Sequence, residues 1–185
     1  MAYKGKIKIF VSGAAALYPC CPKIKELARE VGREIAKQGC ILITGATTGV
    51  PYYVAQGFKE KKGGISIGFS PAASRKAHVK SYKLPEDQMD LIVYTGFDYV
   101  GRNLIATKSA DGAIIACGRI GTLNEFTIAF ETHTPIGVLQ ETGGTADFID
   151  DILRQGHRTE TKIIYSKEPR KLVKELVDHI KKERK

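Results

Sequence analysis

The amino-acid sequence predicts an α/β protein: one domain, residues 1–185, built as a doubly wound parallel sheet of about seven strands with helices on both faces. Three observations support this prediction. Short apolar runs alternate with segments whose apolar residues recur at helical spacing. Several of these runs end in glycine-rich turns that lead directly into the next helical pattern. No internal repeat or linker interrupts the alternation, and strands connected by helices pair in parallel.

Seven short runs are the predicted strands, and most are apolar throughout, as expected of strands buried on both faces. In chain order they cover residues 6–12, 40–44, 65–69, 91–94, 112–117, 135–139 and 162–165. The stretch between the third and fourth runs, residues 70–89, contains two prolines and several charges. We predict a long excursion there, with a short edge strand around residues 79–82. Long excursions in compact domains are often lids or specificity loops.

Helices are predicted between the strands. The first covers residues 22–38 and ends at Gly39, which supplies the left-handed residue that often follows a helix. Pro51 is suited to be the first residue of the second helix. Further helical patterns occupy residues 102–109, the stretch after Thr122 and the residues leading to Gln155.

Residues 167–185 contribute to the net charge of +9, because they hold eight Lys or Arg against four Asp or Glu. Their apolar residues recur at helical spacing: Leu172, Val173, Leu176, Val177 and Ile180. We interpret this segment as an amphipathic helix with a solvated basic face. The alternative is a nucleic-acid contact, which would interleave basic residues with aromatic ones. The segment contains no aromatic residue, so nucleic acid is the least favoured partner.

The composition is that of a soluble globular protein, with 43% hydrophobic and 26% charged residues. No apolar run approaches the ~20 residues of a membrane span, and the first residues lack the pattern of a signal peptide. We therefore expect a cytoplasmic protein without membrane contact.

The cysteines and histidines show no metal-ligand spacing, so no metal is expected. They are Cys20, Cys21, Cys40, Cys117, His78, His133, His157 and His179. Adjacent Cys20 and Cys21 are poorly placed to bond to each other. We expect all four cysteines to be reduced, as is usual in the cytosol.

Two glycine-rich turns, each between a predicted strand and a predicted helix, have the character of anion cradles. Free backbone N–H groups and the helix dipole favour negative charge at such a position. The candidate residues are Gly45, Thr47, Thr48 and Gly49 in one turn and Gly118, Arg119, Gly121 and Thr122 in the other. Either turn alone would be an ordinary connection, but two in one sheet favour a site. Glu125 lies about one helical turn further on, where its charge opposes a bound anion, so its role is more than phosphate binding.

The stretch from Gly101 to Glu131 resembles the LOG (Lonely Guy) family of nucleoside 5′-monophosphate phosphoribohydrolases, long described as lysine decarboxylases. That family carries an Arg at the head of one helix and, after a strand, Pro-Gly-Gly-x-Gly-Thr-x-x-Glu. The family Arg falls on Arg102, an Asp before the strand on Asp111, Gly-Thr on Gly121-Thr122 and the catalytic Glu on Glu125. The motif Pro is replaced by Cys117 and its second Gly by Arg119.

The resemblance implies a Rossmann-like fold, a nucleotide ligand, no cofactor and a homodimer or higher homo-oligomer. It implies hydrolysis of the N-glycosidic bond of a nucleoside 5′-monophosphate, with Glu125 stabilising the oxocarbenium-like sugar and Arg102 holding the phosphate or sugar or assisting the departing base. By the same comparison, Ser12 and Gly13 match a nucleotide-contacting loop. Asp111 is interpreted as a cap or an indirect partner.

Several alternatives remain. Molybdenum-cofactor carrier proteins resemble this superfamily and hold a nucleotide-like ligand without cleaving it, and Cys117 and Arg119 favour such a binder. Arg119 adds a phosphate contact in one interpretation and fills the pocket in the other. A lysine decarboxylase is disfavoured, because Lys108 is the only lysine predicted near the site.

Overall fold

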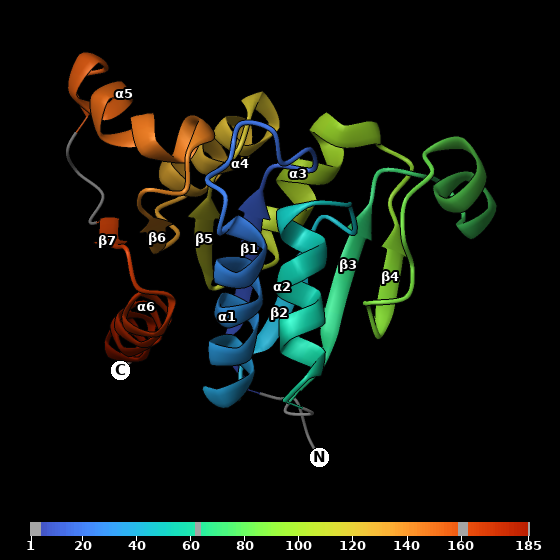
Figure 1. Cartoon of the computed structure of the whole chain (residues 1–185), viewed down its shortest axis with the longest axis horizontal. Coiled ribbons are helices and arrows are strands. Elements are labelled where there is room, and N and C mark those ends of the chain that lie inside the picture. The colour runs from blue at the N-terminus through green and yellow to red at the C-terminus, as the bar shows by residue number, and fades with distance from the viewer. Residues whose placement is uncertain (1–4, 62–63, 159–162, 185) are drawn as a thin grey trace.

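Seven parallel strands form one sheet in the computed structural model, which describes residues 5–61, 64–158 and 163–184. The strands are β1 (Lys8–Gly13), β2 (Ile41–Thr44), β3 (Ser66–Ser70), β4 (Leu91–Tyr94), β5 (Gly112–Ala116), β6 (Ile136–Leu139) and β7 (Ile163–Ser166). Their spatial order is β4-β3-β2-β1-β5-β6-β7, which Figure 1 shows from right to left. The predicted fold class, a Rossmann-like α/β sheet, is confirmed.

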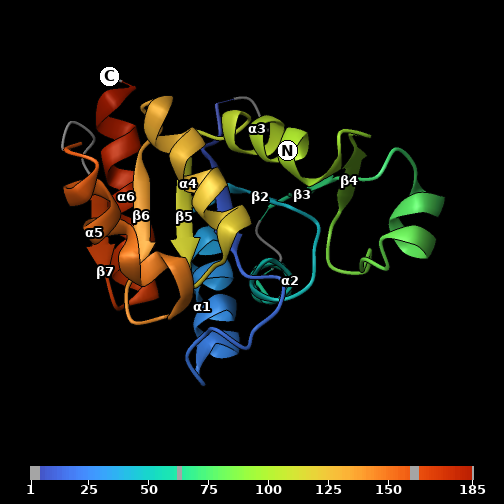
Figure 2. The ribbon, with the colours of Figure 1, turned by 90° about the horizontal axis from the view of Figure 1, so that it is seen from above.

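Helices cover both faces of the sheet. One layer contains α1 (Ile24–Lys37), α2 (Val50–Lys59) and α6 (Pro169–Glu183). The other contains α3 (Asp98–Lys108), α4 (Ile120–Glu131), a 3-10 helix (Gly144–Phe148) and α5 (Ile149–Gln155). Figure 2 shows α3 on the opposite side of the row of strands from α1 and α2.

Two apolar cores result from this arrangement, one on each face. Side chains of a strand point alternately to opposite faces. Ile9 and Val11 of β1 accordingly pack with α1, α2 and α6, whereas Phe10 packs with α4 and β6. Because both faces are covered, the strands must be apolar throughout, which is the pattern that made them recognisable in the sequence.

The order of the strands reverses at β1. This strand pairs with β2 on one side, where Val11 is opposite Thr44, and with β5 on the other, where Gly13 is opposite Ala116. The carboxyl ends of these three strands therefore lie next to one another. Ligands of open α/β sheets bind at such a switch point.

Most predicted elements are present with ends shifted by a few residues. Pro51 is the second residue of α2 instead of the first. The amphipathic segment forms α6, and its apolar face packs on the sheet. None of the described helices is long and apolar enough to cross a bilayer.

The edge strand predicted around residues 79–82 is wrong. That stretch forms a π-helical turn, Ala77–Ser81, within an excursion that projects beyond β4 (Figure 1). The fully buried His78 holds it in place. The His78 ring bonds to Ser70 Oγ through Nδ1 (2.8 Å) and donates from Nε2 to the carbonyl of Pro85 (3.0 Å). This tertiary contact overrides the local β-propensity.

Candidate functional site

A cavity of about 270 Å³ opens at the carboxyl edge of the sheet, at the switch point beside β1. Its walls come from the segments after β1, β2 and β5 and from α3. Of the predicted site residues, those that line it are Ser12, Gly13, Gly45, Thr47, Arg102, Arg119, Gly121, Thr122 and Glu125. The fold thus brings together residues that lie more than a hundred positions apart in the chain.

Arg102 and Glu125 form a buried ion pair in this cavity. Arg102 comes from α3 and Glu125 from the neighbouring α4, and Arg102 Nη1 lies 3.5 Å from Glu125 Oε1. The two side chains are only 6% and 8% exposed. Arg102 Nε is buried and has no hydrogen-bond partner among the described residues. A buried donor without a partner is unfavourable, so the Arg102 Nε–H is suited to donate a hydrogen bond to a ligand.

Further side chains hold the Glu125 carboxylate. The hydroxyl of Ser12 donates to Oε2. Asn103, with its amide nitrogen turned toward its two acceptors, donates to Glu125 Oε1 and to the carbonyl of Tyr99, each at 2.9 Å. The Glu125 carboxylate, which α4 carries into the cavity, is therefore held by Ser12 of β1 and by Arg102 and Asn103 of α3.

Burial raises the pKa of Glu125 above the ordinary value of a glutamate, while Arg102 and the Ser12 hydroxyl act in the opposite direction. Burial also lowers the pKa of Arg102, although a guanidinium stays protonated in proteins. A carboxyl whose proton affinity is increased by burial and opposed by a specific cation is typical of a functional site.

The absence of a side chain at Gly45 leaves space for the Arg102 guanidinium. A Cβ atom at this position would lie 1.7 Å from Arg102 Nη1, so the guanidinium packs directly over the backbone that follows β2. The glycine predicted as part of an anion cradle thus has a second role, which is to position the site's cation.

The start of α4 is open to the cavity. Arg119 is extended and Ile120 begins the helix, and no side chain caps it. The first turn has no acidic residue, and nothing within 4 Å would meet a Cβ at Gly121. Backbone N–H groups at the start of a helix lack helical acceptors, so an anion at this position would find both donors and a favourable dipole.

Arg119 lies at the mouth of the cavity and does not fill it. Its side chain is exposed, and its guanidinium carbon lies 5.2 Å from the centre of the Tyr18 ring. Of the two interpretations of this residue, the geometry favours an added anion contact, because the guanidinium leaves the interior open.

Three predicted residues do not line the cavity. Thr48 is exposed and its hydroxyl donates to the carbonyl of Ala15 (3.1 Å), while Gly49 and Gly118 have φ values of +72° and +109°. A Cβ at Gly49 would lie 2.1 Å from the carbonyl oxygen of Ala14. These residues shape the turns that carry the site.

Asp111 and Lys108 lie outside the cavity lining. Asp111 stands at the amino-terminal end of β5, where it accepts the Lys8 N–H (2.8 Å) and pairs with Arg184 (2.8 Å). Of the two roles predicted for Asp111, a helix–strand cap or an indirect partner of the site, the second is wrong, because β5 separates Asp111 from the cavity. Lys108 is exposed at the end of α3. Within the described ranges, no three His, Cys, Asp or Glu side chains gather in a way that could hold a metal ion.

Tyr99 and Asn103 also belong to the site, although neither was predicted from the sequence. Tyr99 precedes Arg102 by one helical turn, and the Arg102 guanidinium carbon lies 5.8 Å from the centre of its ring. The i, i+3 spacing could have identified Tyr99 as a neighbour on the same helix face. Asn103 carries no such signal, since its role depends on how α3 and α4 pack.

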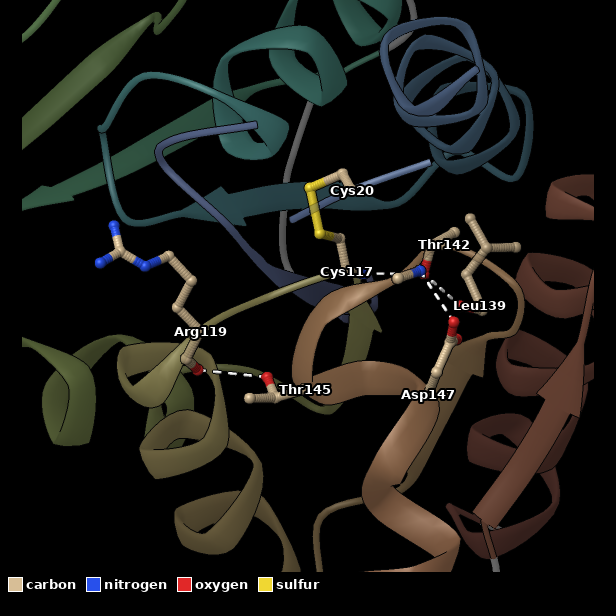
Figure 3. The surroundings of a disulfide bond; sticks show 8 residues. Cys20, Cys117, Arg119, Leu139, Thr142, Thr145 and Asp147 are labelled. Atoms are coloured by element: carbon tan, nitrogen blue, oxygen red, sulfur yellow. Dashed lines mark hydrogen bonds between the residues drawn. A yellow bond between two sulfur atoms is a disulfide. The ribbon is translucent and has the colours of Figure 1, made fainter. Parts of the chain in front are cut away.

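A disulfide joins Cys20 and Cys117 beside the site, so the prediction that all four cysteines are reduced is wrong for this pair (Figure 3). Cys21 and Cys40 are free. The cysteines are 97 positions apart in the sequence, but they follow β1 and β5, which are neighbours in the sheet. Sheet topology creates a proximity that sequence spacing does not reveal.

Comparison with known proteins places these features in a family. The model of the SLOG cluster4 family matches residues 6–173. An uncharacterised protein of Archaeoglobus fulgidus is 30% identical over 134 residues, which make up 72% of this chain and 82% of that protein.

Solved structures share the fold. The X-ray structure of TM1055 is 26% identical, with a TM-score of 0.78 over 95% of this chain and 99% of that chain. A molybdenum cofactor binding protein from Rippkaea orientalis is 25% identical, with a TM-score of 0.75 over 95% and 97% of the two chains. The Moco carrier protein of Chlamydomonas reinhardtii, at 23% identity and a TM-score of 0.75 over 96% and 99%, supports the fold alone.

The predicted resemblance is thereby confirmed at the level of the SLOG/LOG-like Rossmann superfamily. Because the family model spans nearly the whole described domain, the chain belongs to the SLOG cluster4 family.

Proposed function

We propose that this protein binds a nucleoside 5′-monophosphate at the switch point and hydrolyses its N-glycosidic bond. The observation that carries the proposal is the buried Arg102–Glu125 pair, whose Arg102 Nε still lacks a partner among the described residues. An ion pair serving only stability would be expected to satisfy its donors. Here one donor is left for a ligand in a cavity that also receives the open end of α4.

In the proposed reaction the bond between C1′ and the base nitrogen breaks and a water oxygen bonds to C1′. Positive charge develops on the sugar as the base departs, and the Glu125 carboxylate stabilises it and accepts a proton from the water. The proton taken up by Glu125 then passes to the departing base, which regenerates the carboxylate, so the products are free base and ribose 5-phosphate. Burial strengthens this electrostatic effect, because little water screens the carboxylate.

The remaining residues bind the substrate. The backbone at Gly121 and Thr122, together with Thr47 on the facing turn, would contact the 5′-phosphate. Arg102 offers a planar set of donors to the phosphate or the sugar, or assists the departing base. Ser12, Gly13 and Asn103 keep the carboxylate and the nearby backbone in place.

A carrier of a nucleotide or nucleotide-like cofactor is the second candidate. It is favoured by the Rippkaea orientalis structure, a molybdenum cofactor binding protein at 25% identity. Arg119 at the motif position of a glycine also favours it, because a side chain there adds a ligand contact at the mouth. Arg102 Nε and the start of α4 fit a phosphate group of such a ligand equally well.

One experiment separates the two candidates. The protein is incubated with AMP and a panel of other 5′-monophosphates, and free base is measured by chromatography. Glu125→Gln should abolish base release, whereas Glu131→Gln, on the exposed end of the same helix, should leave it unchanged. Ligand retained intact, with thermal stabilisation of the protein, would support the carrier instead.

We also propose that the protein forms a homodimer. Val100 and Leu104 of α3 and Ile120 of α4 are 75%, 48% and 77% exposed, and Ile120 lines the cavity as well. Large apolar side chains that remain exposed on neighbouring helices are typical of an interface. Light scattering should give at least twice the monomer mass, and a monomer would contradict the proposal.

A further inference from the structure

The Cys20–Cys117 disulfide ties together two walls of the cavity. Cys20 belongs to the segment between β1 and α1, which supplies Ala14 and Ala15 to the lining. Cys117 begins the turn between β5 and α4, which supplies Arg119, Ile120 and the first turn of α4. Figure 3 shows the bond lying between these two segments, with Thr142 close to Cys117.

The wall that contains Cys117 is held firmly without the disulfide. The N–H of Cys117 donates to Thr142 Oγ1 (2.8 Å), and its carbonyl accepts the N–H of Ala146 (2.8 Å). The N–H of Thr145 donates to the carbonyl of Gly118 (3.0 Å), and its hydroxyl donates to that of Arg119 (3.2 Å). Loss of the disulfide would leave these bonds in place.

The opposite wall is held mainly at its two ends, next to β1 and next to Cys21. Ala14 and Ala15 are anchored through their carbonyls, which accept from Val50 and Thr48. Further along, the N–H of Cys20 bonds to the carbonyl of Leu17 within the same segment (3.0 Å), and Cys20 forms an isolated antiparallel bridge with Gly143. The N–H of Cys21 donates to the carbonyl of Thr142 (2.9 Å), and Tyr18 stacks on Arg119. The disulfide is the covalent link between this segment and the far wall.

We propose that the Cys20–Cys117 disulfide is a redox-controlled strap on the ligand cavity, closed when oxidised and released by a dithiol. For its effect on ligand affinity, the inference rests on the proposed nucleotide site. The oxidised strap holds the segment 16–20 in place, so less flexibility is lost on binding and the ligand is held more tightly. Reduction frees this segment while the Cys117 turn stays fixed.

The chemistry is a thiol–disulfide exchange. A dithiol attacks Cys20 Sγ, because Cys20 is partly exposed whereas Cys117 is fully buried. The Sγ–Sγ bond breaks and Cys117 leaves as a thiolate, which takes up a proton; the second thiol then releases Cys20. Two electrons and two protons pass to the cysteines, and the dithiol becomes a disulfide. Cys40 takes no part, since burial raises its pKa to about 11 and keeps it a thiol.

The test compares oxidised protein with protein reduced by dithiothreitol, using backbone amide hydrogen exchange. Exchange at Cys20 and Cys21 should accelerate roughly tenfold or more on reduction, because Cys20 lies in the released segment 16–20 and Cys21 directly follows it. Exchange at Thr145 and Ala146 should not change. Cys20→Ser should show the reduced pattern without dithiothreitol, and Cys21→Ser should behave as wild type.

A binding measurement completes the test. The dissociation constant of AMP, measured by calorimetry, should rise roughly fivefold or more on reduction and not respond to dithiothreitol in Cys20→Ser. Equal amide exchange in both states overturns the strap, and so does acceleration that spreads through β5 and β6, which would mark a general scaffold bond. If AMP binds in neither state, the nucleotide proposal fails, while the amide exchange still decides the strap.

Discussion

Arg102 Nη1 lies 3.5 Å from Glu125 Oε1, and both side chains are more than nine-tenths buried although they line a cavity. The two residues come from different helices, and each is held by a residue at the carboxyl end of a strand. Arg102 packs over Gly45 after β2, and Glu125 accepts from Ser12 at the end of β1. The pair is therefore sensitive to changes in residues that carry no charge.

Gly45→Ala should disable the site without changing a charged group. The added Cβ would lie 1.7 Å from Arg102 Nη1, so the guanidinium must move away from Glu125. We expect at least roughly tenfold weaker nucleotide binding and a loss of about 1–3 kcal/mol in the free energy of unfolding, measured by calorimetry and urea denaturation.

Gly121→Ala is the matched control for that change. Nothing within 4 Å would meet its Cβ, and it lies in the first turn of a helix, where Ala is favoured over Gly. Its free energy of unfolding should be unchanged or slightly higher. Equal destabilisation by the two substitutions would contradict the proposed packing of Arg102.

The pH dependence of base release should reflect Glu125. Because burial raises its pKa, the carboxylate form is lost on acidification at a pH above the ordinary value of about 4.3, and kcat/KM should fall there. The Ser12 hydroxyl stabilises the carboxylate and so lowers this pKa. Ser12→Ala should therefore move the acid limb to higher pH, and a shift to lower pH would contradict the assignment. Carbon NMR titration of the Glu125 carboxyl measures the direction of this pKa change directly, without any turnover.

Arg119→Ala should weaken binding of phosphorylated ligands selectively. The guanidinium is exposed at the mouth beside Tyr18, where it adds positive charge for an arriving phosphate. We expect AMP affinity to fall roughly three- to tenfold and its salt dependence to decrease, with adenosine affinity little changed. An equal loss for adenosine would indicate contact with the base or sugar instead.

Removal of the disulfide should lower stability while the fold persists. The bond closes a segment of 97 positions, so its loss should reduce the free energy of unfolding by about 2–5 kcal/mol. Urea denaturation of Cys20→Ser against wild type measures this difference. Cys21→Ser, which alters a free and partly exposed thiol next in the chain, should stay within about 0.5 kcal/mol of wild type.

The sequence predicted the strands well because both faces of the sheet are covered, and a strand such as Gly112–Ala116 must then be apolar along its whole length. It failed around residues 79–82, where the buried His78 imposes a π-helical turn that no local pattern encodes.

The sequence predicted those candidate site residues that belong to the family motif. The resemblance placed Arg102 and Glu125, and the fold brings them together. Asn103 and the Cys20–Cys117 bond were missed for one reason: each depends on which elements become neighbours in space. The α3–α4 contact and the β1–β5 pairing are tertiary facts, and spacing along the chain does not determine them.

The reversal of strand order at β1 divides the sheet into two wings, and the cavity spans the seam between them. Thr47 belongs to the wing of β2, β3 and β4, and Thr122 to the wing of β5, β6 and β7. A phosphate contacted by both residues would link the two halves of the sheet. Binding of the ligand should then make the two halves of the sheet unfold together instead of separately. A molecule that contacts only a few side chains would thereby stabilise the whole protein.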